Sequence, residues 1–138
     1  MSSVEKFISL VDADPSEKRL MLLAAALWYE LRYEIDVAEG TKAIHYAERV
    51  SQSLTHMTIQ GWMARQTDKL GNARHYRMRT APGARARLDR LIVMGLNIEQ
   101  CASEEFGSSH QNAVKGLRKM IVENLKAFAA LTMLPGAN

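Results

Sequence analysis

The stretch from Thr41 to Thr80 constrains the fold of this chain more than any other, because it predicts a helix followed by two short basic segments. Thr41 has a side-chain oxygen that can accept a backbone N–H bond and cap the start of a helix. Apolar residues then recur at helical spacing, at Ala43, Ala47, Val50, Leu54 and Met57. The opposite face is rich in hydrogen-bond donors and poor in acids. We expect this helix to end at Gly61.

Two strand-like segments follow, at 62–66 and 74–79, and Gly71-Asn72 lies in the loop between them, where a positive φ is tolerated. We therefore expect a basic β-hairpin. A helix that leads into such a hairpin is typical of a winged helix-turn-helix. The predicted fold class is mainly α with a small β-hairpin, with N- and C-terminal dimerisation helices.

Helices are also expected before this stretch. Apolar spacing predicts a short helix over residues 3–11. Asp14 in the cap position, Pro15 at the first helical position and Glu17 three residues after the cap predict a second helix, which is apolar on most sides to about Tyr33 and therefore central. Residues 35–37 alternate in character and indicate a minor strand.

Two further helices are expected after the hairpin. Pro82 is placed to open a helix that keeps its phase to about Ala102, and Ser109 is placed to cap a final helix that stops before Pro135. These two helices have more apolar surface than one small core easily covers, so we expect a dimer interface at the chain ends.

The length of 138 residues and a hydrophobic content of 47% predict a single domain, 1–138, with a real core. Within it we expect a winged-helix DNA-binding core at 14–80 and a helical dimerisation region at 1–13 and 82–134.

Positive charge is concentrated in one short part of the chain. Residues 1–64 hold 6 basic and 9 acidic side chains, residues 65–90 hold 8 and 2, and residues 91–138 hold 4 and 4. Seven of the eight basic residues in 65–90 are arginine, whose planar fork suits phosphate oxygens and guanine edges. A solvated basic surface on a protein with a different function is the alternative.

Five short sequence motifs follow one another between residues 61 and 88. They are Gly61-Trp62, Arg65-Gln66-Thr67-Asp68, the basic segment 74–79, Thr80-Ala81-Pro82-Gly83 and Leu88. In these motifs the chain resembles the MarR family of winged-helix transcriptional regulators. It departs from that family at the predicted tip of the wing, where Lys69-Leu70-Gly71-Asn72 stands in place of an Asp-Arg-Arg run. The resemblance implies a dimeric DNA-binding regulator.

In a winged helix the recognition helix enters the major groove and the wing contacts the minor groove or the backbone. The predicted contacts from the helix are Lys42, His45, Tyr46, Arg49, Gln52, Ser53 and His56. The predicted contacts from the wing are Arg65, Lys69, Asn72, Arg74, His75 and Arg77. Arg49 would pair with guanine and Gln52 with adenine, and most of the others would bind phosphate. Structural ion pairs with Glu30 or Asp89 are the alternative for some arginines, above all Arg79, Arg85 and Arg87.

We expect no enzymatic activity, no metal and no cofactor. His45 and His56 are eleven residues apart, about 16 Å along a helix axis, which is too far to share a metal ion. The sequence also has no Cys-x-x-Cys, phosphate-binding loop or Gly-x-Ser-x-Gly motif.

The location is expected to be cytoplasmic. Cys101 is the only cysteine and cannot form an internal disulfide, which fits a reducing compartment. The N-terminus does not have the pattern of a secretion signal, and the longest apolar run, 20–29, is shorter than the roughly 20 residues of a membrane span. Cys101 is either a redox sensor or an inert thiol, and nearby Glu104 and Glu105 favour the inert form by raising its pKa.

The sequence thus predicts a homodimeric, sequence-specific transcription regulator whose partner is double-stranded DNA. A winged-helix protein-interaction adaptor and a nucleoid or plasmid-maintenance DNA binder with little sequence preference are the alternatives. An unidentified small-molecule effector could bind at the dimer interface beside Trp28, Tyr29 and the methionines, although apolar residues at helical spacing more often form plain core.

Overall fold

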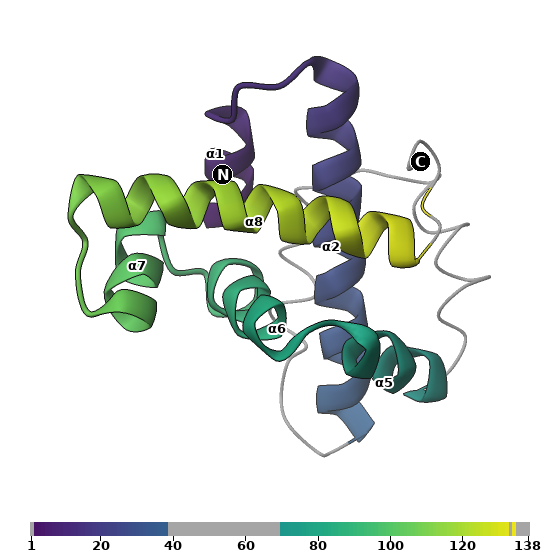
Figure 1. Ribbon diagram of the computed structural model, residues 1–138. Coiled ribbons are helices and arrows are strands. Elements are labelled where there is room, and N and C mark those ends of the chain that lie inside the picture. The colour runs from purple at the N-terminus through teal and green to yellow at the C-terminus, as the bar shows by residue number, and fades with distance from the viewer. Residues whose placement is uncertain (1, 39–69, 133, 135–138) are drawn as a thin grey trace.

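The computed structural model of the chain describes residues 2–38, 70–132 and 134, and every regular element in these ranges is helical. The elements are α1 (Ser3–Ser9), α2 (Pro15–Ala38), α5 (Leu70–Arg79), α6 (Pro82–Leu88), the π-helical segment η1 (Asp89–Val93), α7 (Ile98–Phe106) and α8 (Gln111–Leu131). In Figure 1, α8 crosses α2, with α1 on one side of α8 and α7, α6 and α5 along the other. No helix in the described ranges is both long and apolar enough to cross a membrane.

Local capping chemistry starts the first two helices where the sequence predicts them. Ser2 caps α1 in a reciprocal capping box with Glu5. Asp14 accepts a hydrogen bond from the backbone N–H of Glu17 at 2.8 Å, and Pro15 is the first residue of α2. The strand expected at 35–37 is wrong, because α2 continues through it to Ala38. No glycine or proline lies between Pro15 and Gly40, so no helix-breaking residue ends the helix earlier.

The prediction of a β-hairpin is wrong for its second strand. Residues 74–79 form the C-terminal part of α5, and the described residues contain no strand, so the structure does not show a winged helix with a hairpin wing. Arginine and methionine are good helix formers, and the alternation of Tyr76 and Met78 with basic residues is too short to fix a half-buried strand. The predicted recognition helix at 41–57 and the predicted first strand at 62–66 lie outside the described residues.

The single helix expected from Pro82 to Ala102 is broken in two. After α6 the chain makes one π-helical turn, in which the N–H of Met94 bonds to the carbonyl of Asp89 at 2.8 Å. Gly95 then adopts a left-handed φ of +71°, which a residue without a Cβ reaches at no steric cost. Asn97 starts α7 with a second capping box, so the break has its own local stabilisation.

The core lies where α2 crosses α8. Trp28 is fully buried and meets the ring of Phe128 edge-on, at 5.0 Å between centroids. The buried face of α8 consists of Leu117, Ile121, Leu125, Phe128 and Ala129. This is the apolar stripe from which the sequence predicted a dimer interface, and it is covered within one chain. Homodimer formation stays a prediction.

Candidate functional site

The residues predicted to contact DNA fall into two groups. Nine lie outside the described part of the chain: Lys42, His45, Tyr46, Arg49, Gln52, Ser53, His56, Arg65 and Lys69. The remaining four, Asn72, Arg74, His75 and Arg77, are on helix α5 and not on a wing.

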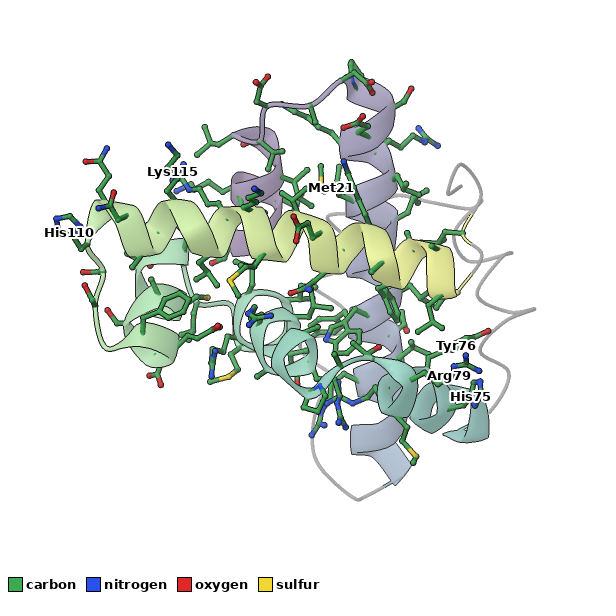
Figure 2. The ribbon with its side chains drawn as sticks, viewed as in Figure 1. Met21, His75, Tyr76, Arg79, His110 and Lys115 are labelled. Atoms are coloured by element: carbon green, nitrogen blue, oxygen red, sulfur yellow. The ribbon has the colours of Figure 1, made fainter. Side chains whose placement is uncertain are left out.

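Because residues 74–79 form a helix and not the predicted strand, side chains that were expected on one face of the strand point in different directions. Residues two apart share a face on a strand, but on a helix they point about 200° apart. His75 is accordingly exposed, whereas the side chain of Arg77 is only 13% exposed and turns inward. In Figure 2, His75 and Arg79 lie on α5, at the opposite end of the molecule from Lys115 on α8.

Arg77 is held by a polar cluster that joins three helical segments. Its guanidinium donates to both oxygens of Asp89 in η1, each at 2.9 Å. The indole N–H of Trp28 donates to the same carboxylate at 2.9 Å, and the guanidinium lies over the Trp28 ring, 4.9 Å from its centroid. This bidentate geometry fixes α5 against α2, so Arg77 has a structural role in this fold.

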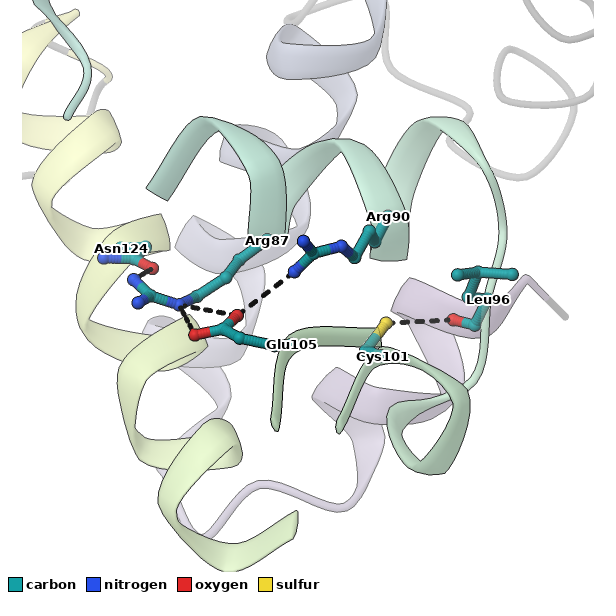
Figure 3. Close-up of polar contacts among 6 residues, drawn as sticks. All are labelled: Arg87, Arg90, Leu96, Cys101, Glu105 and Asn124. Atoms are coloured by element: carbon teal, nitrogen blue, oxygen red, sulfur yellow. Dashed lines mark hydrogen bonds and ion pairs between the residues drawn. The ribbon is translucent and has the colours of Figure 1, made fainter. Parts of the chain in front are cut away.

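A second polar cluster is formed by Arg87 and Arg90 around the carboxylate of Glu105, as Figure 3 shows. Arg87 Nε donates to Glu105 at 2.9 Å, and Arg90 donates to the same carboxylate at 3.2 Å. Arg87 also reaches the side-chain oxygen of Asn124 on α8 at 3.3 Å. For Arg87 the structure shows the alternative, a structural ion pair, but its partner is Glu105 of α7 and not Glu30 or Asp89.

These pairings leave a smaller set of arginines for an external partner. Between residues 70 and 88 the chain has five arginines and no acidic residue. Arg77 and Arg87 are paired to acids elsewhere, whereas Arg79 is exposed and has no ion pair with any described residue. Arg85 is half-buried, and its Nε has no hydrogen-bond partner among the described residues. Among the described arginines of this segment, the exposed cation left for an external partner is therefore Arg79, followed by the half-buried Arg85.

Cys101 lies in the core, only 1% exposed, and its thiol faces the carbonyl of Leu96 at 3.8 Å. Burial raises the pKa of this thiol from 9.0 to about 11, and Arg90 lowers it by less than burial raises it. Glu105 and Glu104 also raise it, as the sequence predicts, but burial is the main cause. The geometry favours an inert thiol over a redox sensor.

We expect the native protein to react with a disulfide reagent at pH 7 at least about 100-fold more slowly than the unfolded chain, because the thiol is both buried and protonated. Since the pKa is raised on folding to about 11, the thiol favours the folded state below pH 9 and loses this contribution as the pH rises through 11. Labelling rates measured with and without urea test the slow reaction of the native thiol. Alkaline unfolding of the original protein and of Cys101→Ala tests the pH dependence, because the variant should lack the thiol's contribution. Equal labelling rates in the two states would contradict the buried position.

Among the described residues, no group of three His, Cys, Asp or Glu side chains is placed to hold a metal ion.

Comparison of the chain with known families, with curated proteins and with solved structures gives no match. The resemblance to the MarR family stays a prediction from the sequence, and the functional argument below rests on the residues themselves.

Proposed function

We propose that the protein is a dimeric DNA-binding regulator of transcription that contacts the phosphate backbone with the arginines of α5 and α6 that are not paired to acids, above all the exposed Arg79. In this proposal the cations are presented by two helices and not by a hairpin. The assignment of base reading rests on the sequence alone, on the donor-rich face predicted for residues 42–56. A cytoplasmic location is part of the proposal.

One observation carries this proposal: five arginines and no carboxylate between residues 70 and 88, with Arg79 fully available at the surface. Arginine binds phosphate through several N–H donors at once, and a segment without acids adds no repulsion of its own to the DNA backbone. Such contacts release condensed counterions, so binding should weaken steeply as salt is added. Arg77 and Arg87 are not counted, because their guanidinium groups already bind Asp89 and Glu105.

We expect Arg79→Ala to weaken binding to every duplex about threefold to tenfold, and to lower the slope of log K against log salt by about 0.9, the loss of one phosphate contact. Fluorescence anisotropy with a random-sequence duplex at several salt concentrations measures both quantities. Arg79→Lys should retain part of the affinity and nearly all of the slope, because the charge is kept.

The matched control is Arg118→Ala, which removes an exposed arginine from α8. It should leave duplex affinity and its salt slope unchanged. If Arg79→Ala behaves like the control, or if the unmodified protein does not bind duplex DNA at low salt, the proposal is wrong.

A further inference from the structure

We propose that Asp89 is a positioning residue for DNA binding. By holding Arg77 against the core, Asp89 sets the rotation of α5 about its own axis and so turns Arg79 outward, toward the phosphate backbone. The contact with DNA rests on the proposed function, but the rotation of α5 can be tested without DNA. In this proposal Asp89, which lies in η1, does not itself contact the nucleic acid.

The anchor of α5 is the guanidinium group of Arg77. Its two terminal nitrogens donate to the two carboxylate oxygens of Asp89, each at 2.9 Å, and this pair of bonds fixes the plane of the guanidinium as well as its position. The guanidinium carbon lies 4.9 Å from the centre of the Trp28 ring. The indole N–H donates to the same carboxylate at 2.9 Å, so α2 holds Asp89 in turn. A rotation of α5 would break these contacts.

Helical geometry connects this inward anchor to the outward direction of Arg79. Residues two apart on an α-helix point about 200° apart, so Arg79 leaves α5 on the side opposite to Arg77. His75, four residues before Arg79, shares that outer side. The exposures agree with this geometry, because the side chain of Arg77 is 13% exposed whereas His75 and Arg79 are both exposed. The rotation that Asp89 fixes therefore places an imidazole and a guanidinium together on the outer face of α5.

A second hold acts at the C-terminal end of α5. Thr80 directly follows Arg79 and is only 8% exposed, and its hydroxyl donates to the carbonyl of Tyr76 at 2.9 Å. This hold does not involve Asp89. We therefore expect loss of the Asp89 anchor to loosen the rotation of α5 without unfolding the helix.

Charge alone predicts the opposite effect of removing Asp89. A carboxylate close to a phosphate-binding segment repels DNA, so its removal should strengthen binding if Asp89 acts only through its charge. Removal should weaken binding if Asp89 acts through the direction of Arg79. The sign of the change in affinity therefore separates the two mechanisms.

The first test compares Asp89→Asn with the original full chain by fluorescence anisotropy on a random-sequence duplex. We expect the variant to bind about threefold more weakly, although it has lost a negative charge. Arg77→Lys keeps the positive charge but loses the two-bond fork, and it should show a similar loss. Circular dichroism and thermal unfolding check that each variant is folded at the measuring temperature.

Unchanged or tighter binding by Asp89→Asn would overturn the proposal. If Asp89→Asn does not fold, Arg77→Lys decides the outcome alone, and unchanged binding by that variant would overturn the proposal in the same way.

A double-mutant cycle tests whether Asp89 acts through Arg79. In the Asp89→Asn background, Arg79→Ala should weaken binding less than about twofold, because Arg79 is no longer held toward the backbone. The accompanying change in the salt slope should be well below the value of about 0.9 expected for one phosphate contact. Effects of the two substitutions that simply multiply would show that the side chains act independently, which contradicts a positioning role.

Glu105→Gln is the matched control. Glu105 also accepts from two arginines and is 17% exposed, but these arginines, Arg87 and Arg90, lie in α6 and η1 and not in α5. The variant removes one acid and leaves the anchor of α5 in place, so it should bind duplex at least as tightly as the original protein. Equal weakening by Glu105→Gln and Asp89→Asn would trace the loss to general loosening of the fold and refute the proposal.

A measurement without DNA separates this inference from the proposed function. Phenylglyoxal modifies accessible guanidinium groups, and tandem mass spectrometry locates the label. In the original protein Arg79 should be labelled at least about fivefold faster than Arg77, whose fork is occupied by Asp89, and Asp89→Asn should reduce this difference. Equal labelling of the two arginines in the original protein, or an unchanged difference in Asp89→Asn, would show that Asp89 does not set the rotation of α5. If labelling is as expected but the original protein binds no duplex, the proposed function is wrong and the rotation set by Asp89 stands.

Discussion

Replacement of Trp28 by alanine should lower the free energy of unfolding by about 4 kcal/mol, the largest effect we expect from a single substitution in this protein. The indole is completely buried and contacts the ring of Phe128 on α8. It also donates a hydrogen bond to Asp89 and lies beneath the guanidinium of Arg77. Alanine would leave a cavity at the crossing of α2 and α8 and would remove all of these contacts at once.

Trp28→Phe separates packing from hydrogen bonding. It keeps an aromatic ring beside Phe128 but removes the N–H donor to Asp89, so we expect a smaller loss of about 1–2 kcal/mol. Urea unfolding followed by far-ultraviolet circular dichroism measures both variants. A loss below about 1 kcal/mol for Trp28→Ala would mean that the α2–α8 crossing is not the centre of the fold.

The second large effect is expected for Asp89→Ala, at about 2–3 kcal/mol, because it leaves two donors without their shared acceptor. The side chains of Arg77 and Asp89 are 13% and 26% exposed, so solvent screens the pair in part, and we take a value below that for a fully buried pair. Loss of this carboxylate should also loosen α5, since Arg77 is its charged link to η1.

Glu17→Ala is the matched control for Asp89→Ala. It also removes the acid of an ion pair, but Glu17 and Lys126 are each 46% exposed and 3.5 Å apart, so the expected loss is at most about 0.5 kcal/mol. A double-mutant cycle with Arg77→Met adds a sharper test. If Asp89→Ala costs the same in the Arg77→Met background as in the original protein, the two side chains do not interact as described.

The ion-pair clusters around Asp89 and Glu105 show that several arginines of the arginine-rich segment are structural. From sequence, seven arginines between residues 65 and 90 looked like one cationic surface. In the fold, Arg77, Arg87 and Arg90 are directed to internal carboxylates, and Arg79 is the exposed arginine that remains among those whose side chains the structure describes. A charge count cannot show this, because the paired acids lie 12 to 18 residues away along the chain.

A groove lined by α1, the start of α7 and α8 was overlooked for a related reason. Lys115, Arg118, Lys119 and Lys126 recur at helical spacing in the sequence, so a cationic side of the last helix could have been predicted. The short first helix lies next to it only in the folded chain, and the apolar floor is formed by both helices and the start of α7 together. Helical periodicity in a sequence shows which residues share one face of a helix, but not which other helix lies beside that face.

The sequence by itself determined the starts of α1, α2 and α6, the central position of α2 and the existence of the final helix, because caps, prolines and apolar periodicity act over a few residues. The expected cap of that final helix, Ser109, is wrong, because His110 caps α8. Only the tertiary structure decided that residues 74–79 are helical and that Arg77 faces inward. An isolated basic segment has no strong local preference, and its conformation follows from what it packs against. Here α5 packs against α2, and the carboxylate of Asp89 together with the indole of Trp28 selects the helix over the strand.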